Sequence, residues 1–249
     1  MLEFLSIALM LAYIALRNRY LGFLAWLLFG VSWLLKIPHY LEISDYYNTA
    51  IMVLAFMLFA FIGATILKAK NQEVFISATS VAFVSSLIYF SFALTDLKRL
   101  LISHTADVTV GAAKLLGFQF NRYDWNILEY HGKYVEIILA CTGIESMALF
   151  AGITLSTRAD VSRRVYAFLS SVPVIYVLNI LRNIFITAAF GDQWFGPESF
   201  YIAHHVISKI LATVALMLIS LSVFRFLPEF ADLIFNLKDE MVKTWKERG

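Results

Sequence analysis

Seven apolar stretches follow one another along the 249 residues of this chain, and they constrain its fold more than any other feature. A helix that crosses a membrane needs about 20 mostly apolar residues, within a range of about 17–25. Hydrophobic residues make up 60% of the chain and charged residues 15%. In soluble domains, roughly 45–50% of residues are apolar and about 25% are charged. The sequence therefore predicts an all-α, polytopic membrane bundle of about seven transmembrane helices. The predicted spans are residues 2–16, 21–35, 49–67, 74–95, 138–157, 165–190 and 202–226.

The first two stretches are short, so residues 2–35 could instead form a tight helical hairpin around Arg17, Asn18 and Arg19. The first stretch has no basic segment before it and no small-residue cleavage site after it, which favours a retained span over a signal peptide. The sequence contains no repeat, low-complexity segment or Gly/Ser linker. We therefore predict one membrane domain over residues 1–249, with a core at about 74–226 and an amphipathic tail at 227–249.

The loops between the stretches differ in their content of Lys and Arg, which sets the orientation of membrane helices. The first, third and fifth loops and the C-terminal tail are rich in basic residues. The second loop contains only Lys36, and the sixth, from Gly191 to Tyr201, contains none. We therefore expect a cytoplasmic C-terminus and even-numbered loops that face outward. The long fourth loop is also basic, but long loops cross membranes largely regardless of their charge.

The fourth loop has a pattern of its own. From Leu100 to Phe118, apolar residues recur at helical spacing, which predicts an amphipathic helix at the outer interface with Gly117 near its C-terminus. Residues 123–126 and 130–134 are typical of turns or a short hairpin. After the last stretch, residues 226–245 are again amphipathic, and we expect them to lie on the inner face.

Three chemically reactive groups interrupt the apolar pattern in the second half of the chain. They are the single cysteine, Cys141, the guanidinium of Arg182, and the neighbouring imidazoles of His204 and His205. The predicted topology puts Cys141 near the outer end of the fifth span and the histidines in the first turn of the seventh. At about 1.5 Å per residue, Arg182 lies roughly 26 Å into the sixth span, which is also near the outer boundary. A thiol, a guanidinium and an imidazole at one depth could form a cysteine acyl-transfer site.

Each of these groups also has a structural interpretation. Cys141 could be a small packing residue, Arg182 could reach the headgroups from a span end, and the histidines could be ordinary interfacial residues. Glu145 lies four residues after Cys141, on the same face of the predicted helix. It could pair with Arg182, orient an imidazole or belong to a structural ion pair. Asn179 and Asn183 share a helix face, and we expect them to hydrogen-bond between helices.

The composition of the chain limits which cofactors and partners can be expected. A single cysteine excludes an intramolecular disulfide and a multi-cysteine metal site. His104 and His131 are too scattered to propose as metal ligands, so we expect no metal and no cofactor. The net charge of +2 is too small to indicate a nucleic-acid partner.

Three segments together resemble the motifs of archaeosortases, the archaeal branch of the exosortase/archaeosortase family. Residues 140–147, with the string Cys-Thr-Gly-Ile-Glu, are similar to the family's cysteine motif. Residues 179–183 resemble its arginine motif, and residues 203–208 resemble its histidine motif. The order of the three motifs agrees as well, and the resemblance covers roughly residues 74–226.

The resemblance implies a membrane cysteine peptidase with transpeptidase character. Cys141 would be the nucleophile that forms a thioester, and Arg182 would stabilise the oxyanion or the thiolate. A histidine would act as general acid and base. The family usually has a small residue four positions after this histidine, and Ser208 stands four positions after His204. We therefore favour His204 and keep His205 as the alternative.

The resemblance also implies the substrates and the location. The substrates would be secreted proteins of the archaeal cell surface with a C-terminal sorting tail, made of a short motif, a hydrophobic span and a basic end. The enzyme would be a multi-pass protein of the cell membrane that cuts near the motif on the outer face. It would then pass the new carboxyl end to the amine of a membrane phospholipid.

Three other functions compete with this hypothesis. A transporter or channel would need polar residues through the depth of several spans, whereas here the polar groups gather at one predicted face. Another intramembrane enzyme, such as a rhomboid-like protease or a lipid-modifying transferase, is the second alternative. A rhomboid would need a Gly-x-Ser-x-Gly segment, which the sequence lacks. An assembly scaffold with a structural Cys/Arg/His cluster is the third alternative, and it should tolerate the change Cys141→Ala.

Overall fold

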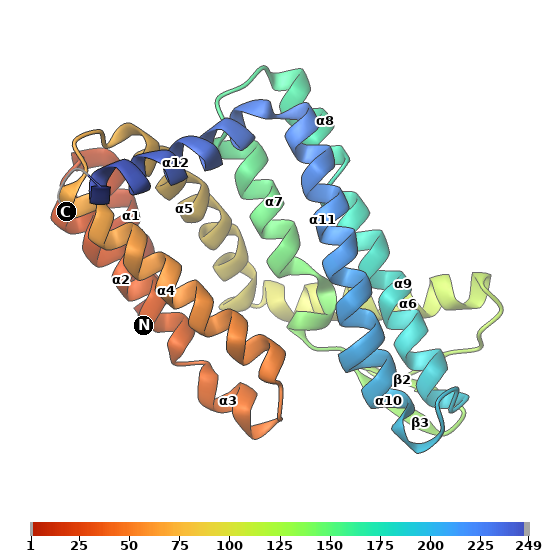
Figure 1. Cartoon of the computed structure of the whole chain (residues 1–249). Helices are drawn as coiled ribbons and strands as arrows, with labels where there is room; N and C mark the ends of the chain where they lie inside the picture. Colours follow the sequence, from red (N-terminus) through yellow and green to blue (C-terminus); the bar gives the residue numbers. More distant parts are fainter. Residues whose placement is uncertain (1, 247–249) are drawn as a thin grey trace. The chain divides into compact units, whose positions relative to one another are not determined.

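The computed structural model describes residues 2–246, which divide into two compact units (Figure 1). The first unit holds the chain up to Leu87, together with Ser156–Arg158 and the segment from Glu229 onward. The second unit holds Ile88–Leu155 and Ala159–Pro228. Every site residue predicted above therefore belongs to the second unit. One membrane domain over the whole chain stays a prediction.

Each of the seven predicted spans overlaps a helix. Within residues 2–246, five helical segments are long and apolar enough to cross a membrane. Two shorter apolar helices, Leu2–Leu16 and Ile144–Ser156, overlap the first and fifth predicted spans. The all-α membrane bundle is therefore confirmed, although two of its apolar helices are shorter than a full span. The five long segments are Arg19–Glu42, Tyr46–Lys68, Glu73–Ala93, Val161–Gly191 and Gly196–Phe226.

The first unit begins with a helical hairpin. Helices α1 (Leu2–Leu16) and α2 (Arg19–Leu34) pack against each other and are joined by only two residues. The chain turns at Arg17, whose φ is 55°, and the Asn18 side chain then accepts a hydrogen bond from the backbone N–H of Tyr20 at 2.9 Å. This bond satisfies one of the N–H groups that lack a partner at a helix start. The hairpin that the sequence allowed here is thus present.

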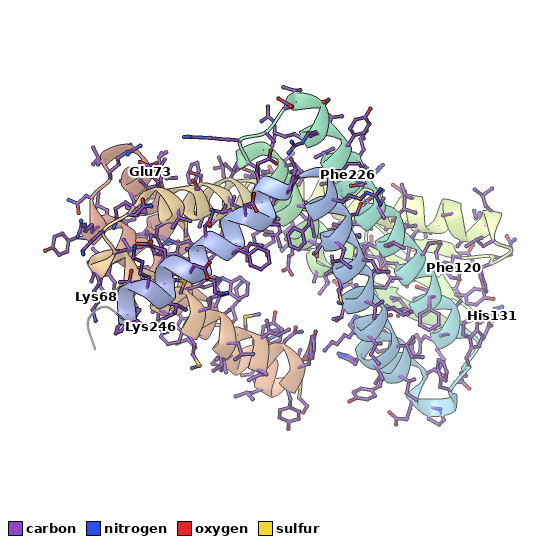
Figure 2. The ribbon with its side chains drawn as sticks, turned by 45° about the horizontal axis from the view of Figure 1, so that its top comes forward. Lys68, Glu73, Phe120, His131, Phe226 and Lys246 are labelled. Carbon is purple, nitrogen blue, oxygen red and sulfur yellow. The ribbon has the colours of Figure 1, made fainter. Side chains whose placement is uncertain are left out.

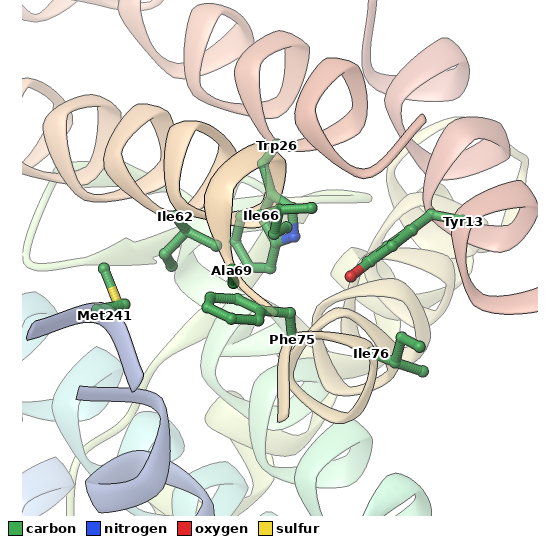
Figure 3. Close-up of a cluster of buried hydrophobic side chains, with 8 residues drawn as sticks. All are labelled: Tyr13, Trp26, Ile62, Ile66, Ala69, Phe75, Ile76 and Met241. Carbon is green, nitrogen blue, oxygen red and sulfur yellow. The ribbon is translucent and has the colours of Figure 1, made fainter. Parts of the chain in front are cut away.

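Four more helices contribute to the first unit, and the three longer ones share an apolar cluster of buried side chains with the hairpin (Figure 3). Inside this unit the Trp26 indole donates a hydrogen bond to the Thr79 hydroxyl at 2.9 Å, and the Tyr13 hydroxyl donates to Gln72 Oε1 at 2.8 Å. Because an unpaired polar group is costly in apolar surroundings, these bonds favour one way of packing the helices. The helices are α3 (Ile37–Glu42), α4 (Tyr46–Lys68), most of α5 (Glu73–Ala93) and α12 (Pro228–Lys246). The cluster contains Tyr13, Trp26, Ile62, Ile66, Ala69, Phe75, Ile76 and Met241.

The C-terminal helix α12 packs on the end of α4. The Trp245 indole donates to the Thr65 hydroxyl at 3.0 Å, and the Lys68 ammonium lies 3.6 Å from the centre of the Trp245 ring. Figure 2 shows the ends of the two helices, marked by Lys68 and Lys246, close together. The predicted amphipathic tail is therefore a helix, and its position on the inner face stays a prediction.

The second unit contains the predicted amphipathic helix of the fourth loop. This helix, α6, spans Leu97–Leu115, and its buried residues include Ile102 and Ala106. The chain then reverses at Gly117, whose φ of 92° lies in the region that favours glycine. The helix is confirmed, while its position at the outer interface stays a prediction.

A three-stranded antiparallel sheet follows α6. Its strands are β1 (Asn121–Asp124), β2 (Ile127–Tyr130) and β3 (Lys133–Glu136), in the order β1-β2-β3. The turn between β2 and β3 consists of His131 and Gly132, whose φ values of 50° and 75° suit the tight turn of a two-residue hairpin. The sequence predicted only turns or a short hairpin here, so the third strand is a finding of the structure.

One face of the sheet packs on α6 and α9 (Val172–Gly191). Leu128 is fully buried in this contact, and Tyr130 is 8% exposed. A side chain at Gly191 would place its Cβ 2.3 Å from the Tyr130 ring, so only glycine lets α9 approach the strand this closely. Arg122 ties β1 to α6 through hydrogen bonds to both the carbonyl and the hydroxyl of Ser103 at 3.1 and 3.0 Å.

The rest of the second unit continues from the sheet to the last long helix. A short 3-10 turn, η1, leads from β3 into α7, and a π-helical turn, η3, leads into α11 (Figure 1). Pro173 stands in the first turn of α9, where its missing N–H does not interrupt the helix. The elements are η1 (Leu139–Thr142), α7 (Ile144–Ser156), α8 (Val161–Leu169), η2 (Gly196–Glu198), α10 (Ser199–Tyr201), η3 (Ile202–Ile207) and α11 (Ser208–Phe226).

Candidate active site

Cys141 lies in the turn η1 and not in a helix that crosses the membrane. Its backbone N–H donates to the carbonyl of Ile138 at 2.8 Å, which closes the turn. Gly143 then adopts a φ of 76°, and α7 begins only at Ile144. The prediction that Glu145 lies one helical turn below Cys141 on the same face is therefore wrong, because the left-handed glycine redirects the chain between them.

Two asparagines of α9 hold the turn that contains the cysteine. The side-chain amides of Asn179 and Asn183 both donate to the backbone carbonyl of Cys141, the second at 2.9 Å. Both asparagines are buried, and they lie one helical turn apart, so they reach the same oxygen from one face of α9. A Cβ at Gly143 would lie 3.3 Å from Asn179, which together with the positive φ explains why a glycine stands two residues after the cysteine. The two asparagines thus hydrogen-bond to another element, as expected, and their acceptor is the backbone of Cys141 itself.

Asn183→Asp should loosen this turn. The change keeps the shape of the side chain but replaces the amide donor with a carboxylate, which would face the Cys141 carbonyl without a hydrogen bond. An orphaned buried polar group costs about 1–3 kcal/mol, so we expect a lower melting temperature of the purified protein in detergent. Cys141 should also react faster with a maleimide. Asn71→Asp is the control, because exposed Asn71 accepts a hydrogen bond through its oxygen and should leave both readouts unchanged. Equal melting temperatures for the two variants would contradict the role of Asn183.

Arg182, which lies one residue before Asn183 on α9, contacts a histidine from a different element. Its Nη2 atom lies 3.4 Å from Nε2 of His204. His204 belongs to the π-helical turn η3, a rare geometry that is frequent at functional sites. Its ring stacks on Phe200, with the ring centres 5.3 Å apart and the planes at 6°. The ring contact thus restrains the imidazole that faces the guanidinium.

The two neighbouring histidines have different surroundings. His205 stacks on Tyr201, with the ring centres 5.4 Å apart. His204 is the one whose ring nitrogen faces Arg182. The sequence alone could not separate the two positions, because adjacent residues differ mainly in the direction in which the helix points them.

The thiol of Cys141 is half-buried and sits in a mixed electrostatic environment. Burial raises its pKa, because removal from water disfavours the charged thiolate. The backbone N–H of Ile138 and the positive charge of Arg182 act in the opposite direction, and the carboxylate of Glu136 raises the pKa further. Burial thus opposes formation of the thiolate, whereas the positive charge of Arg182 would favour it.

Glu145 takes a different place from the one expected. Its side chain is exposed, and its carboxylate accepts a hydrogen bond from the hydroxyl of Tyr89 at 3.5 Å. Within the described part of the chain, Glu145 forms no hydrogen bond or ion pair with Arg182 or His204. The carboxylate whose charge reaches the thiol is that of Glu136, which sequence reasoning missed. It stands in a short strand five residues before the cysteine, where no periodic pattern distinguishes it.

The histidines of the fourth loop have structural contacts. Nδ1 of His131 lies 2.8 Å from Oδ1 of Asp192, and His104 stacks on Tyr176 at 6.3 Å between ring centres. Among residues 2–246, no group of three or more His, Cys, Asp or Glu side chains is placed to hold a metal ion. A reaction without metal or cofactor stays an expectation.

The chain was compared with family models, with curated proteins and with solved structures. The family model described as transmembrane exosortase (Exosortase_EpsH) matches residues 4–221. The chain is 28% identical to archaeosortase A of Natronomonas pharaonis over 247 residues, which covers 86% of this chain and 77% of that protein. It is also 28% identical to archaeosortase A of Haloferax volcanii over 259 residues, which covers 88% and 85%. No solved structure matches the chain.

Proposed function

Because this chain belongs to the transmembrane exosortase family, we propose that it is a membrane cysteine transpeptidase that removes the C-terminal sorting tails of secreted proteins. Its similarity to two proteins named archaeosortase A supports a role in protein sorting. The observation that carries the chemistry is that Arg182 acts on both of the other two groups. Arg182 of α9 contacts His204 of η3, and its charge acts on the thiol of Cys141 in η1.

In the first half of the reaction, Cys141 attacks the scissile carbonyl of the substrate. The thiol loses its proton to His204, and the sulfur forms a bond to the carbonyl carbon. Arg182 donates hydrogen bonds to the developing oxyanion, a role that its planar, permanently charged fork suits. The C–N bond then breaks, and protonated His204 gives its proton to the leaving amine of the tail. The products of this step are the free tail and a thioester on Cys141.

In the second half, an amine of a membrane phospholipid attacks the thioester. Neutral His204 accepts the proton that the amine loses, and the sulfur leaves as a thiolate that Arg182 stabilises. The product is an amide between the new carboxyl end and the lipid, so the secreted protein stays anchored after its tail is lost. A site at headgroup depth on the outer face would hold both reactants and restrict competing water.

The test is to trap the thioester in membranes. The protein is co-expressed with a secreted reporter that carries the C-terminal sorting tail of a surface protein from the source organism. We expect loss of the tail and an adduct between enzyme and reporter that hydroxylamine cleaves, because hydroxylamine reacts with thioesters. Mass spectrometry of the released reporter should then find a lipid headgroup on its new C-terminus. Tail loss with a free carboxyl end would exclude the lipid transfer, and tail loss without any adduct would exclude the thioester.

A further inference from the structure

One edge of the three-stranded sheet is open and regular. Strand β3 pairs only with β2, since the strand order is β1-β2-β3. In that pair Val135 lies opposite Leu128, and the N–H of Ile137 donates to the carbonyl of Asn126 at 2.7 Å. Hydrogen-bonded and non-hydrogen-bonded pairs alternate along antiparallel strands. The backbone N–H and C=O groups of the intervening residues therefore point away from β2.

These outward groups belong to Tyr134 and Glu136. Within the described residues 2–246, the outward backbone groups of both residues form no hydrogen bond. Folded proteins usually protect such an edge with a bulge, a proline or a covering element. The opposite edge of this sheet has a bulge, between Arg122 and Asp124 in β1, whereas the pairing of β2 with β3 is regular along its whole length.

The open edge leads directly to the candidate nucleophile. Ile138 continues the extended backbone of β3, with φ −107° and ψ 174°, and its carbonyl accepts the hydrogen bond that closes the Cys141 turn. By the same alternation, its N–H faces the same side as those of Tyr134 and Glu136. That N–H also acts on the sulfur of Cys141 and lowers its pKa. The thiol thus lies at the end of a row of backbone groups spaced about 7 Å apart, the two-residue repeat of a strand.

We propose that the open edge of β3 binds the substrate segment that precedes the scissile bond, as a fourth strand of the sheet. This inference rests on the proposed function, because its occupant is the chain that Cys141 cleaves. The substrate segment and β3 both end at the thiol, so the two strands run parallel, and an added parallel strand is compatible with an antiparallel sheet. Main-chain hydrogen bonds to an edge bind an extended peptide largely regardless of its sequence.

The exposed face beside this edge offers contacts for substrate side chains. The rings of Tyr134 and Tyr123 lie 4.8 Å apart in an edge-to-face arrangement and are 53% and 67% exposed. Alternate side chains of an added strand would lie over this face and over the exposed side chain of Glu136. The site therefore fits an extended polypeptide that lays an apolar side chain over the two tyrosine rings, farther from the scissile bond than Glu136.

Tyr134→Pro tests the edge in the full-length protein. Proline removes the outward N–H but none of the hydrogen bonds to β2, and edge strands tolerate such a proline. Tyr134→Ala is the matched control, because it removes the same ring and keeps the N–H. We expect Tyr134→Pro to cleave the tailed reporter about 5- to 10-fold more slowly than Tyr134→Ala, the effect of one or two hydrogen bonds. Labelling of Cys141 by a small maleimide should be equal in the two variants. Equal cleavage by both variants would overturn the proposal.

A second measurement uses the unchanged enzyme, so it does not depend on the folding of a variant. Single prolines are placed at each of the six reporter residues before the scissile bond. A fourth strand predicts that cleavage falls at every second position, because only alternate N–H groups of the reporter face β3. Uniform losses, or none, would overturn the strand. Persistent cleavage by Cys141→Ala would instead refute the proposed function, and the two failures are therefore distinguishable.

Discussion

Cys141→Ala should abolish cleavage of the tailed reporter, with a rate loss on the order of 10⁶. A loss of that size is expected when the nucleophile is removed from a group of residues that act together, since the thioester route then disappears. The fold should survive, because Cys141 is only half-buried and alanine is smaller. The measurement is the fraction of reporter that loses its tail in membranes. The amount of folded enzyme is determined from its peak on size-exclusion chromatography in detergent.

Cys141→Ser is the matched control for this experiment. It keeps the size and hydrogen-bonding capacity of the side chain, but a hydroxyl is a far weaker nucleophile than a thiol at neutral pH. We expect no hydroxylamine-sensitive adduct and cleavage below detection. Normal tail loss in both variants would remove the nucleophile from the mechanism. The assembly scaffold, which tolerates changes at this cysteine, would then be the better hypothesis.

His204→Ala should lower the rate of cleavage by about 10²–10⁴-fold, whereas His205→Ala should change it less than about 3-fold. The first range is the usual effect of removing a general acid and base. The difference follows from the structure, where Nε2 of His204 faces Arg182 and the ring of His205 stacks on Tyr201. Initial rates of tail loss at limiting reporter provide the comparison. The two variants control for each other, because both remove an imidazole from the same π-helical turn.

A reversed result would change the assignment and not the chemistry. If His205→Ala were the inactive variant, the imidazole that serves Cys141 would belong to the other position, and the contact between His204 and Arg182 would be structural. Equal activity of both variants and wild type would exclude histidine as the proton carrier. pH profiles of the cleavage rate complement this comparison. The variant that lacks the acting imidazole should lose one of the two slopes of the wild-type profile.

The helices could be predicted because apolar length and periodicity are local properties. Each of the seven stretches overlaps a helix, and the amphipathic segments of the fourth loop and the tail are helices as well. The misplaced element is the turn around Cys141, which lies inside the span predicted from hydropathy. Hydropathy averages over about 19 residues, so it cannot detect a single left-handed glycine that delays the start of a helix.

The chain by itself determined the class of the protein and the chemical types at its candidate site. A membrane bundle follows from apolar content, and a single thiol, an intramembrane arginine and a pair of histidines can be found by inspection. Only the tertiary structure decided which histidine faces Arg182, that two asparagines hold the Cys141 carbonyl, and that β3 leaves an open edge beside the thiol. The asparagine contacts join residues 38 and 42 positions apart. Such contacts depend on how helices pack and turn in three dimensions, which no local pattern of residues encodes.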